Sequence, residues 1–156
     1  MAETLSLVLR TAVFTFFLPF LVTIGGPFLL LGRRTPAPGF WPLAAAPFLA
    51  GGAAVYLWCA WNFILEGKGT PAPWDPPRFL VRAGLYRFSR NPMYLGVLVF
   101  LAGECLLFAS LRLAAYSAVI FLAFHLRTVL YEEPALRRRF GAAYDEYCRR
   151  VPRWLF

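Results

Sequence analysis

Two short polar clusters carry the residue types from which a binding site for a charged ligand could be built. The first is Arg90-Asn91-Pro92-Met93-Tyr94-Leu95-Gly96, and the second is Tyr131-Glu132-Glu133-Pro134. A pair of carboxylates can accept hydrogen bonds from an ammonium group or from sugar hydroxyls. An arginine can hold a carboxylate through two parallel hydrogen bonds, and the face of a tyrosine ring attracts a cation. These residue types suit a ligand that carries both signs of charge.

The same residues also allow a purely structural interpretation. Glu132 and Glu133 could pair with Arg90 or Arg127 at a membrane surface, and Pro92 could mark the first turn of a helix. Residue types alone do not separate this interpretation from a ligand site.

The elements that carry the two clusters are expected to lie in a membrane. Of the 156 residues, 60% are hydrophobic, and the mean hydropathy is +0.59, whereas a soluble domain averages about 45–50% apolar residues. We predict one all-α integral membrane domain over residues 1–156. Apolar runs long enough to cross a hydrocarbon core about 30 Å thick predict four transmembrane helices, over about residues 7–31, 41–65, 93–109 and 111–130.

The last two of these helices should form a tight antiparallel hairpin, because only Ser110 and its neighbours separate them. In such a hairpin, residues whose numbers sum to about 221 lie at equal depth. This register places Tyr94 beside Arg127, Arg90 beside Tyr131, and Gly96 beside His125. The two polar clusters should therefore meet at one mouth of the hairpin.

Basic residues set the expected orientation. With four spans, the amino terminus, the 66–92 segment and the tail share one side and carry most of the positive charge, whereas the other side receives only Arg33, Arg34 and Arg112. The positive-inside rule places the basic side, with the site and the carboxyl terminus, in the cytosol. The alanine- and arginine-rich composition favours a bacterial cytoplasmic membrane. We assign the net charge of +8 to this topology and to lipid contact, and expect no nucleic-acid partner, because such binders carry their charge on a soluble surface.

The tail after Pro134 has the pattern of one amphipathic helix lying along the cytosolic face with its apolar side inward. The apolar stripe recurs at spacings of three and four residues: Leu136, Phe140, Tyr144, Tyr147 and Val151. Two acid-before-base pairs at a spacing of four support the helix, namely Asp145 with Arg149 and Glu146 with Arg150.

Further short motifs surround the two clusters in a specific order and spacing. They are Gly67-Lys68-Gly69-Thr70-Pro71, Trp74-Asp75-Pro76-Pro77, Gly84-Leu85-Tyr86-Arg87, Phe140-Gly141 and Val151-Pro152, together with the tail stripe. In this combination, about residues 66–152 resemble the isoprenylcysteine carboxyl methyltransferase and phospholipid methyltransferase superfamily, in its compact bacterial form. Asn91 stands where isoprenylcysteine enzymes often carry histidine, so the strip is closer to the phospholipid branch.

The resemblance implies transfer of a methyl group from S-adenosylmethionine to a lipophilic acceptor at the membrane–cytosol boundary. The acceptor could be a prenylcysteine-type carboxylate, a phospholipid amine or another small lipid, so the implied partners are this acceptor and membrane lipids. The implied catalytic residues are Arg90 and Glu133. The implied cofactor contacts are Gly67, Gly69, Arg90, Asn91, Pro92, Tyr94, Leu95, Gly96, His125, Tyr131, Glu132 and Glu133.

Two other hypotheses stay open. A non-catalytic membrane module that binds lipid or assists assembly would retain the fold without the chemistry. A small transporter would need polar residues along a path at mid-membrane, whereas the charges here collect at one mouth. Glu104 lies toward the opposite end, and we expect it to have a structural partner on one of the first two spans. The three cysteines have no metal-ligand spacing, so no metal is expected.

Overall fold

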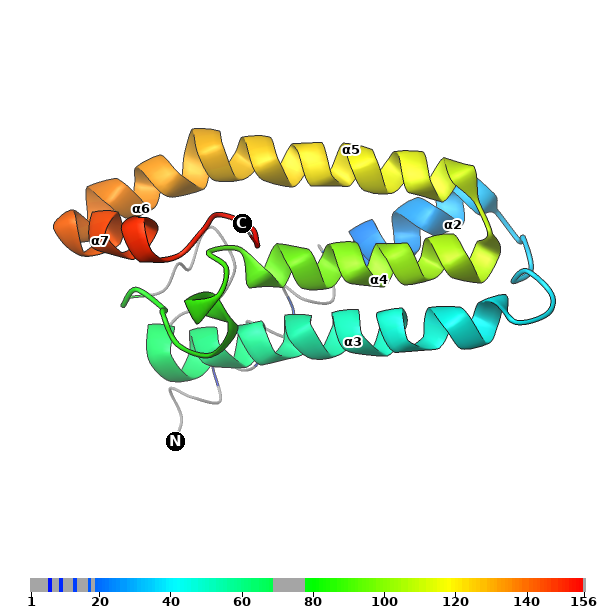
Figure 1. Ribbon diagram of the computed structural model, residues 1–156, viewed down its shortest axis with the longest axis horizontal. Helices are drawn as coiled ribbons and strands as arrows, with labels where there is room; N and C mark the ends of the chain where they lie inside the picture. Colours follow the sequence, from blue (N-terminus) through cyan, green and yellow to red (C-terminus); the bar gives the residue numbers. More distant parts are fainter. Residues whose placement is uncertain are drawn as a thin grey trace.

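The computed structural model is all helical over the part of the chain that it describes, which is residues 6, 9, 13, 17, 19–68 and 78–155. Three long helices lie side by side along the long axis of the molecule (Figure 1): α3 (Trp41–Asn62), α4 (Pro92–Phe108) and α5 (Leu111–Arg127). A shorter helix, α2 (Gly26–Leu31), follows a π-helical turn at Leu21–Gly25. The prediction of an all-α fold is confirmed for this part of the chain.

Two continuous helical stretches are long and apolar enough to cross a membrane, Trp41–Gly67 and Leu111–Phe140. The helical segments Leu21–Leu31 and Pro92–Phe108 are apolar but shorter. The 17 residues of α4 extend about 26 Å at 1.5 Å per residue, which is less than the roughly 30 Å of a hydrocarbon core. Most of residues 7–18 of the expected first span lie outside the described residues. Four spans therefore stay a prediction, and two are supported by length and composition.

A two-residue turn joins α4 to α5 and reverses the chain. Ala109 has a left-handed backbone with φ of 44°, and Ser110 is extended. The two helices run antiparallel (Figure 1), but α4 packs much more closely against α3 than against α5.

Glycines explain the close contact between α3 and α4. A Cβ atom added to Gly52 would lie 2.5 Å from the backbone nitrogen of Phe100 and 2.6 Å from the carbonyl oxygen of Gly96. A Cβ atom added to Gly96 would lie 2.9 Å from the backbone nitrogen of Tyr56. Small residues at a helix crossing allow backbones to approach closely. Gly96 therefore fits a helix–helix contact.

The helix that begins with α5 continues past the acidic pair. A π-helical turn covers Thr128–Glu132, and α6 (Glu133–Phe140) follows it directly. Pro134 occupies the first turn of α6, where its missing N–H group would interrupt a regular helix. The predicted fourth span ends near residue 130, and the helix itself continues beyond this point to Phe140, because the widened turn carries the chain past the proline without a break.

The tail forms two helices where the sequence pattern predicts one. The chain breaks at Gly141, whose φ of 52° is in the region that favours glycine, and α7 (Ala142–Arg150) follows. The apolar stripe is nevertheless packed inward: Tyr144, Tyr147 and Val151 are buried in one cluster with Leu136 and Phe140.

Of the two predicted ion pairs of the tail, Glu146 pairs with Arg150. Asp145 instead pairs with Arg137 at 2.7 Å, because the break at Gly141 lets α7 fold back against α6.

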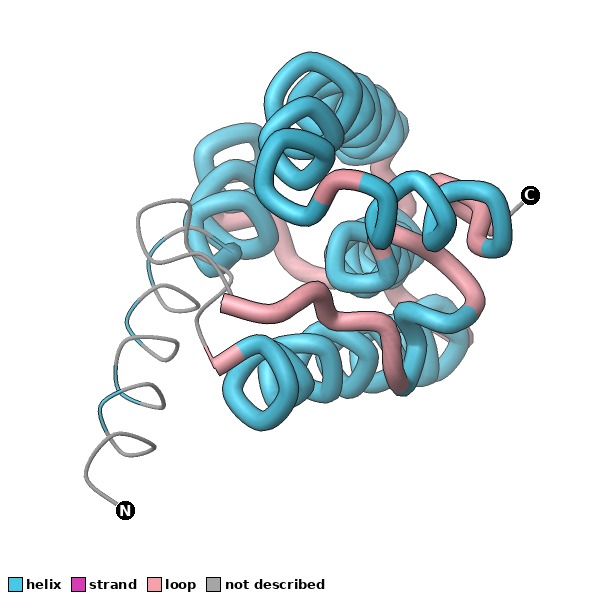
Figure 2. The backbone as a smooth tube through the Cα atoms, turned by 90° about the vertical axis from the view of Figure 1, so that its left-hand side faces the viewer, coloured by secondary structure: helices cyan, strands magenta, loops and turns pink. Residues whose placement is uncertain are grey.

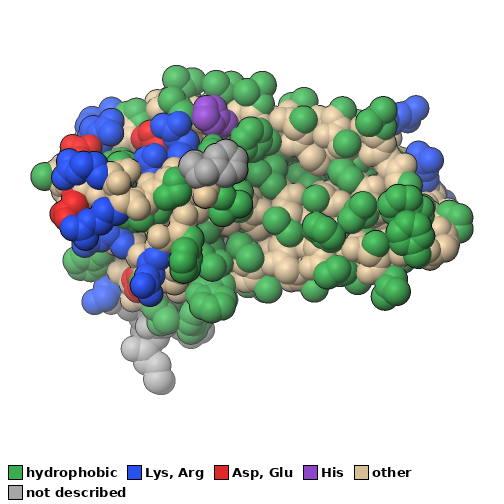
Figure 3. All heavy atoms as spheres, viewed as in Figure 1, with side chains coloured by type: hydrophobic (Ala, Val, Ile, Leu, Met, Phe, Trp, Pro, Cys, Tyr) green, Lys and Arg blue, Asp and Glu red, His purple; other side chains and the backbone are tan. Residues whose placement is uncertain are grey.

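Charged side chains gather at the end of the molecule where α6 and α7 lie, and a band of hydrophobic and uncharged atoms covers its middle (Figure 3). Figure 2 views this charged end and shows short helices and loops lying across the ends of the long helices. Residues 78–91, which include a 3₁₀ helix at Gly84–Arg87, are part of this end. Polar groups from distant parts of the sequence are thus brought to one end of the helical bundle.

The helix crossing leads to a stability prediction with a matched control. Gly52→Val should lower the free energy of unfolding by about 1–3 kcal/mol, because the new side chain has no room against α4. Gly51→Val is the control, since a Cβ atom at Gly51 meets no heavy atom within 4 Å. Thermal unfolding of both purified variants in detergent should show a lower midpoint for Gly52→Val only. Equal midpoints would contradict the proposed packing constraint.

Candidate functional site

A cavity of about 710 Å³ lies at the charged end of the helical bundle. This volume is within the range of small-molecule sites, about 300–1,000 Å³. Its polar lining includes Arg90, Asn91, Tyr94, Arg127, Thr128, Tyr131, Glu132 and Glu133. Its apolar lining includes Val22, Tyr56, Phe63, Val97, Ile120 and Phe124. One hollow therefore has a polar side and an apolar side.

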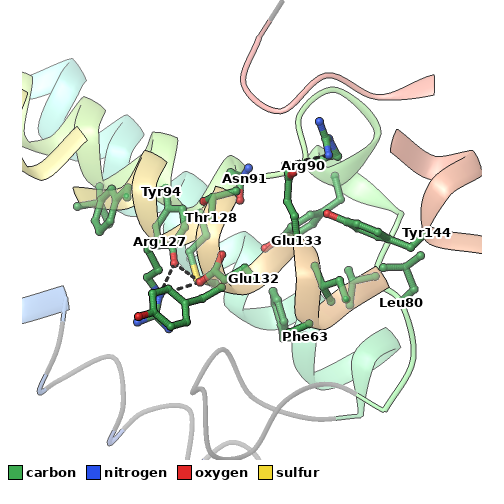
Figure 4. Close-up of a pocket in the computed structure, with 18 of the residues that line it drawn as sticks. Phe63, Leu80, Arg90, Asn91, Tyr94, Arg127, Thr128, Glu132, Glu133 and Tyr144 are labelled. Carbon is green, nitrogen blue, oxygen red and sulfur yellow. Dashed lines mark hydrogen bonds and ion pairs between the residues drawn. The ribbon is translucent and has the colours of Figure 1, made fainter. Parts of the chain in front are cut away.

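The first polar group joins α4 to the π-helical turn after α5. The Tyr94 hydroxyl donates a hydrogen bond to Oε1 of Glu132. Nε of Arg127 donates to the same Oε1 at 2.8 Å and to the Tyr94 hydroxyl at 3.1 Å, and these contacts are drawn in Figure 4. The Tyr94 ring also stacks on Phe124 with ring centroids 4.2 Å apart. Tyr94 is thus held at both its ring and its hydroxyl.

The second polar group is centred on the buried carboxylate of Glu133. Nη1 of Arg90 donates a hydrogen bond to Oε1 of Glu133 at 3.0 Å (Figure 4). Arg153 donates two hydrogen bonds to the same carboxylate, from Nε to Oε1 at 2.6 Å and from Nη2 to Oε2 at 3.0 Å. The hydrogen bonds and negative charge of Glu133 raise the pKa of Arg153 above its ordinary value. Two arginines therefore share one carboxylate, and this cluster keeps a net positive charge.

The segment that follows α7 lies across the start of α4. The carbonyl oxygen of Arg153 accepts hydrogen bonds from Nδ2 of Asn91 at 2.9 Å and from the Ser89 hydroxyl at 3.2 Å. The backbone N–H of Arg90 donates to the carbonyl oxygen of Pro152 at 2.9 Å. Asn91 is thus engaged by the carboxyl-terminal segment.

Two buried polar atoms beside the cavity have no hydrogen-bond partner within the described part of the chain, Nε of Arg90 and Oγ1 of Thr128. Both residues line the cavity. A buried polar group without a partner costs about 1–3 kcal/mol, and such groups are uncommon in folded proteins. Arg90 and Thr128 therefore each carry a polar atom that the described protein groups leave unsatisfied, in residues that also line the cavity.

Tyrosines from α7 close another part of the cavity wall. The Tyr147 hydroxyl donates to the carbonyl oxygen of Tyr86 at 2.7 Å, and Tyr144 is 2% exposed. Burial raises the pKa of both Tyr144 and Tyr147 well above the ordinary tyrosine value. These hydroxyls are neutral at neutral pH in any case, and the raised pKa values keep this part of the wall uncharged at higher pH as well.

The predicted site residues divide between the cavity and other contacts. Those that line the cavity are Arg90, Asn91, Tyr94, Tyr131, Glu132 and Glu133. Pro92 is buried in the first turn of α4, and Leu95 is not part of the cavity lining.

Gly96, His125 and Gly67 make contacts elsewhere. The register predicts Gly96 beside His125, but Gly96 faces α3, and Nδ1 of His125 accepts a hydrogen bond from Nε1 of Trp154 at 3.3 Å. Gly67 ends a π-helical turn, and its carbonyl oxygen accepts the backbone N–H of Arg78 at 2.7 Å. Gly69 lies outside the described residues. The sequence predicts a structural partner for Glu104 on one of the first two spans. Its Oε2 atom is buried and has no hydrogen-bond partner within the described residues, so no partner is found for this atom.

Sequence reasoning missed several residues of the site. Thr128 precedes Glu132 by four residues, so its place on the same helix face was a usable signal. Phe63 and Tyr144 gave only the signal of apolar packing. Arg153 gave none, because nothing in the local sequence separates it from the other arginines of the tail.

Comparison with known proteins adds an independent observation. Residues 74–143 match the family model of the phospholipid methyltransferases. A protein-S-isoprenylcysteine O-methyltransferase B of Arabidopsis thaliana is 36% identical over 73 residues, which cover 47% of this chain and 37% of that protein. Probable protein-S-isoprenylcysteine O-methyltransferases of rice, from the indica and japonica subspecies, are 37% identical over 73 residues, covering 46% of this chain and 38% of each relative.

The match thus spans less than two fifths of the length of these curated relatives. No solved structure matches the chain. The relatives are plant proteins, so a bacterial source stays a prediction. The resemblance to the isoprenylcysteine and phospholipid methyltransferase superfamily is confirmed over residues 74–143, which hold both polar clusters of the cavity.

Proposed function

We propose that this protein is a methyltransferase that uses S-adenosylmethionine and acts on a lipophilic acceptor at a membrane surface. The observation that carries the proposal is one cavity whose lining combines two polar groups with an apolar side and includes Arg90 and Thr128, each with a buried polar atom that has no hydrogen-bond partner among the described residues. The match to methyltransferase sequences covers the elements that supply the polar side.

The polar side has a partner for each type of group in this cofactor. Arg90 is suited to bind the methionyl carboxylate through its guanidinium, whose Nε has no partner within the described part of the chain. Glu132 is suited to accept hydrogen bonds from the ammonium or the ribose, and Thr128 to bond a ribose hydroxyl. The stacked rings of Tyr94 and Phe124 offer an aromatic surface to the adenine or the sulfonium. When bound, the cofactor supplies an electrophilic methyl group.

The apolar side suits the acceptor. Val22, Val97 and Ile120 come from three different helical segments and line the same cavity, so a lipid chain could be enclosed there while its reactive group reaches the polar side. Methyl transfer is an in-line displacement, and holding the two reactants in line supplies much of the catalysis. Arg90 and Glu133 are the residues that we propose to fix the reacting groups. Oε1 of Glu133 accepts a hydrogen bond from Nη1 of Arg90.

The location of the cavity supports a membrane-boundary enzyme. The cavity lies at the charged end of the helical bundle, and Figure 3 shows a hydrophobic band beside this end. We propose that this end faces the cytosol, so that cofactor enters from water and the acceptor enters from the bilayer.

Binding of S-adenosylhomocysteine tests the cofactor assignment. Calorimetry in detergent should detect binding by the wild type and a loss of at least about tenfold in affinity for a Glu132→Ala and Glu133→Ala double variant, because each tenfold loss corresponds to about 1.4 kcal/mol. Glu146→Ala is the control, since this glutamate lies in α7 and pairs with Arg150 at the surface. Absence of binding by the wild type would favour the non-catalytic membrane module.

Methyl transfer itself should be measured with labelled S-adenosylmethionine. Label should appear in a component of a total lipid extract or in a prenylcysteine analogue, and Arg90→Ala should reduce the rate by at least about tenfold if Arg90 fixes a reactant. Folded wild-type protein that binds S-adenosylhomocysteine but labels neither acceptor class would contradict the proposed acceptor.

A further inference from the structure

The two adjacent glutamates of the acidic pair have different surroundings. Both oxygens of Glu133 are engaged, by Arg90 and by the two donors of Arg153. Glu132 uses only Oε1, which accepts from Tyr94 and Arg127. Within the described part of the chain, no hydrogen bond reaches Oε2 of Glu132. A new ligand therefore finds an available carboxylate oxygen on Glu132.

We propose that Glu132 is the carboxylate that binds the cofactor, and that Glu133 is a positioning residue clamped by Arg153 of the carboxyl-terminal segment. This assignment rests on the function proposed above and divides the acidic pair into two roles. Arg153 is not part of the cavity lining, so it acts through Glu133.

Arg153 can restrain two elements at once, because its side chain contacts one element and its backbone contacts another. Its guanidinium binds Glu133 at the start of α6 through two parallel hydrogen bonds, a geometry that gives orientation as well as charge. Its carbonyl oxygen accepts from Asn91 and Ser89 at the start of α4. One residue thus contacts both polar clusters, whose members Arg90 and Glu133 are 43 residues apart in sequence.

The neighbouring Trp154 fixes the clamp on α5. Its Nε1 donates to Nδ1 of His125 at 3.3 Å, and its ring lies 5.3 Å from that of Phe121 between centroids. The carboxyl-terminal segment therefore reaches from the start of α4 to α5, and Trp154 restricts the positions that Arg153 can adopt. His125 thereby receives a structural role as the acceptor of this hydrogen bond.

The contact between Arg153 and Glu133 affects the cavity through Arg90. Oε1 of Glu133 accepts a hydrogen bond from Nη1 of Arg90, while Nε of Arg90 is buried and has no partner among the described residues. If Arg153 is removed, Glu133 keeps Arg90 as its one cationic partner. The Glu133 carboxylate can then turn toward Arg90, which alters the direction of the Nε–H donor of Arg90. Removing Glu133 leaves two neighbouring arginines without a carboxylate, which is the larger perturbation because like charges repel.

A double-mutant cycle on binding of S-adenosylhomocysteine tests the division of roles. Arg153→Ala should weaken binding by about tenfold, and adding Glu133→Gln should cost no more than Glu133→Gln alone, because contacting residues that act as one unit are not additive. Arg153→Ala and Glu132→Gln should instead multiply their effects. Arg149→Ala, an exposed arginine of the same tail, should bind like the wild type.

A conservative variant keeps the test decisive if Arg153→Ala does not fold. Arg153→Lys retains the charge but not the two-donor fork, so its affinity should lie between those of the wild type and Glu133→Gln. Wild-type affinity in Arg153→Lys and in any folded Arg153→Ala protein, or multiplied effects of Arg153→Ala and Glu133→Gln, would overturn the clamp.

Thermal unfolding separates this proposal from the proposed function. The same cycle on unfolding midpoints should show Arg153 and Glu133 coupled even without ligand. If the wild type fails to bind S-adenosylhomocysteine, the proposed function and the role of Glu132 are overturned, whereas uncoupled midpoints overturn the clamp alone.

Discussion

The shared ion pair on Glu133 is the interaction on which the candidate site depends. It joins the start of α6 to Arg90, just before α4, and to Arg153, beyond α7. Breaking a buried ion pair by removing one partner is costly, because the remaining charge loses its compensation. The pair therefore holds together three segments at one end of the bundle, and two of them, the Arg90 strip and the start of α6, line the cavity.

The charge balance of the site follows from this interaction. Two arginines face one carboxylate at Glu133, whereas Arg127 and Glu132 form a balanced pair elsewhere in the cavity lining. The cavity thus has an excess positive charge near Arg90 and a carboxylate oxygen available on Glu132. A ligand that carries both a carboxylate and an ammonium matches this separation of charge.

The close contact of α3 with α4 is a second constraint on the site, and it acts through the position of α4. Gly52 and Gly96 bring the two backbones together, which draws α4 toward α3 and away from α5. The space so created is lined by Tyr94 and Val97 of α4 and by Ile120 and Phe124 of α5. The glycine of the Arg90–Gly96 strip thus contributes to the cavity through packing.

The sequence by itself determined the helical class, the turn near Ser110, the inward stripe of the tail and the two polar clusters, because each follows from local periodicity, turn residues or side-chain chemistry. Tertiary structure decided that Gly96 packs on α3, that the helix passes through the acidic pair, and that Arg153, rather than another arginine of the tail, joins Arg90 on Glu133. Arg153 is separated from Asn91 by 62 residues in sequence. Contacts at such separations depend on how whole helices pack, which no local pattern specifies.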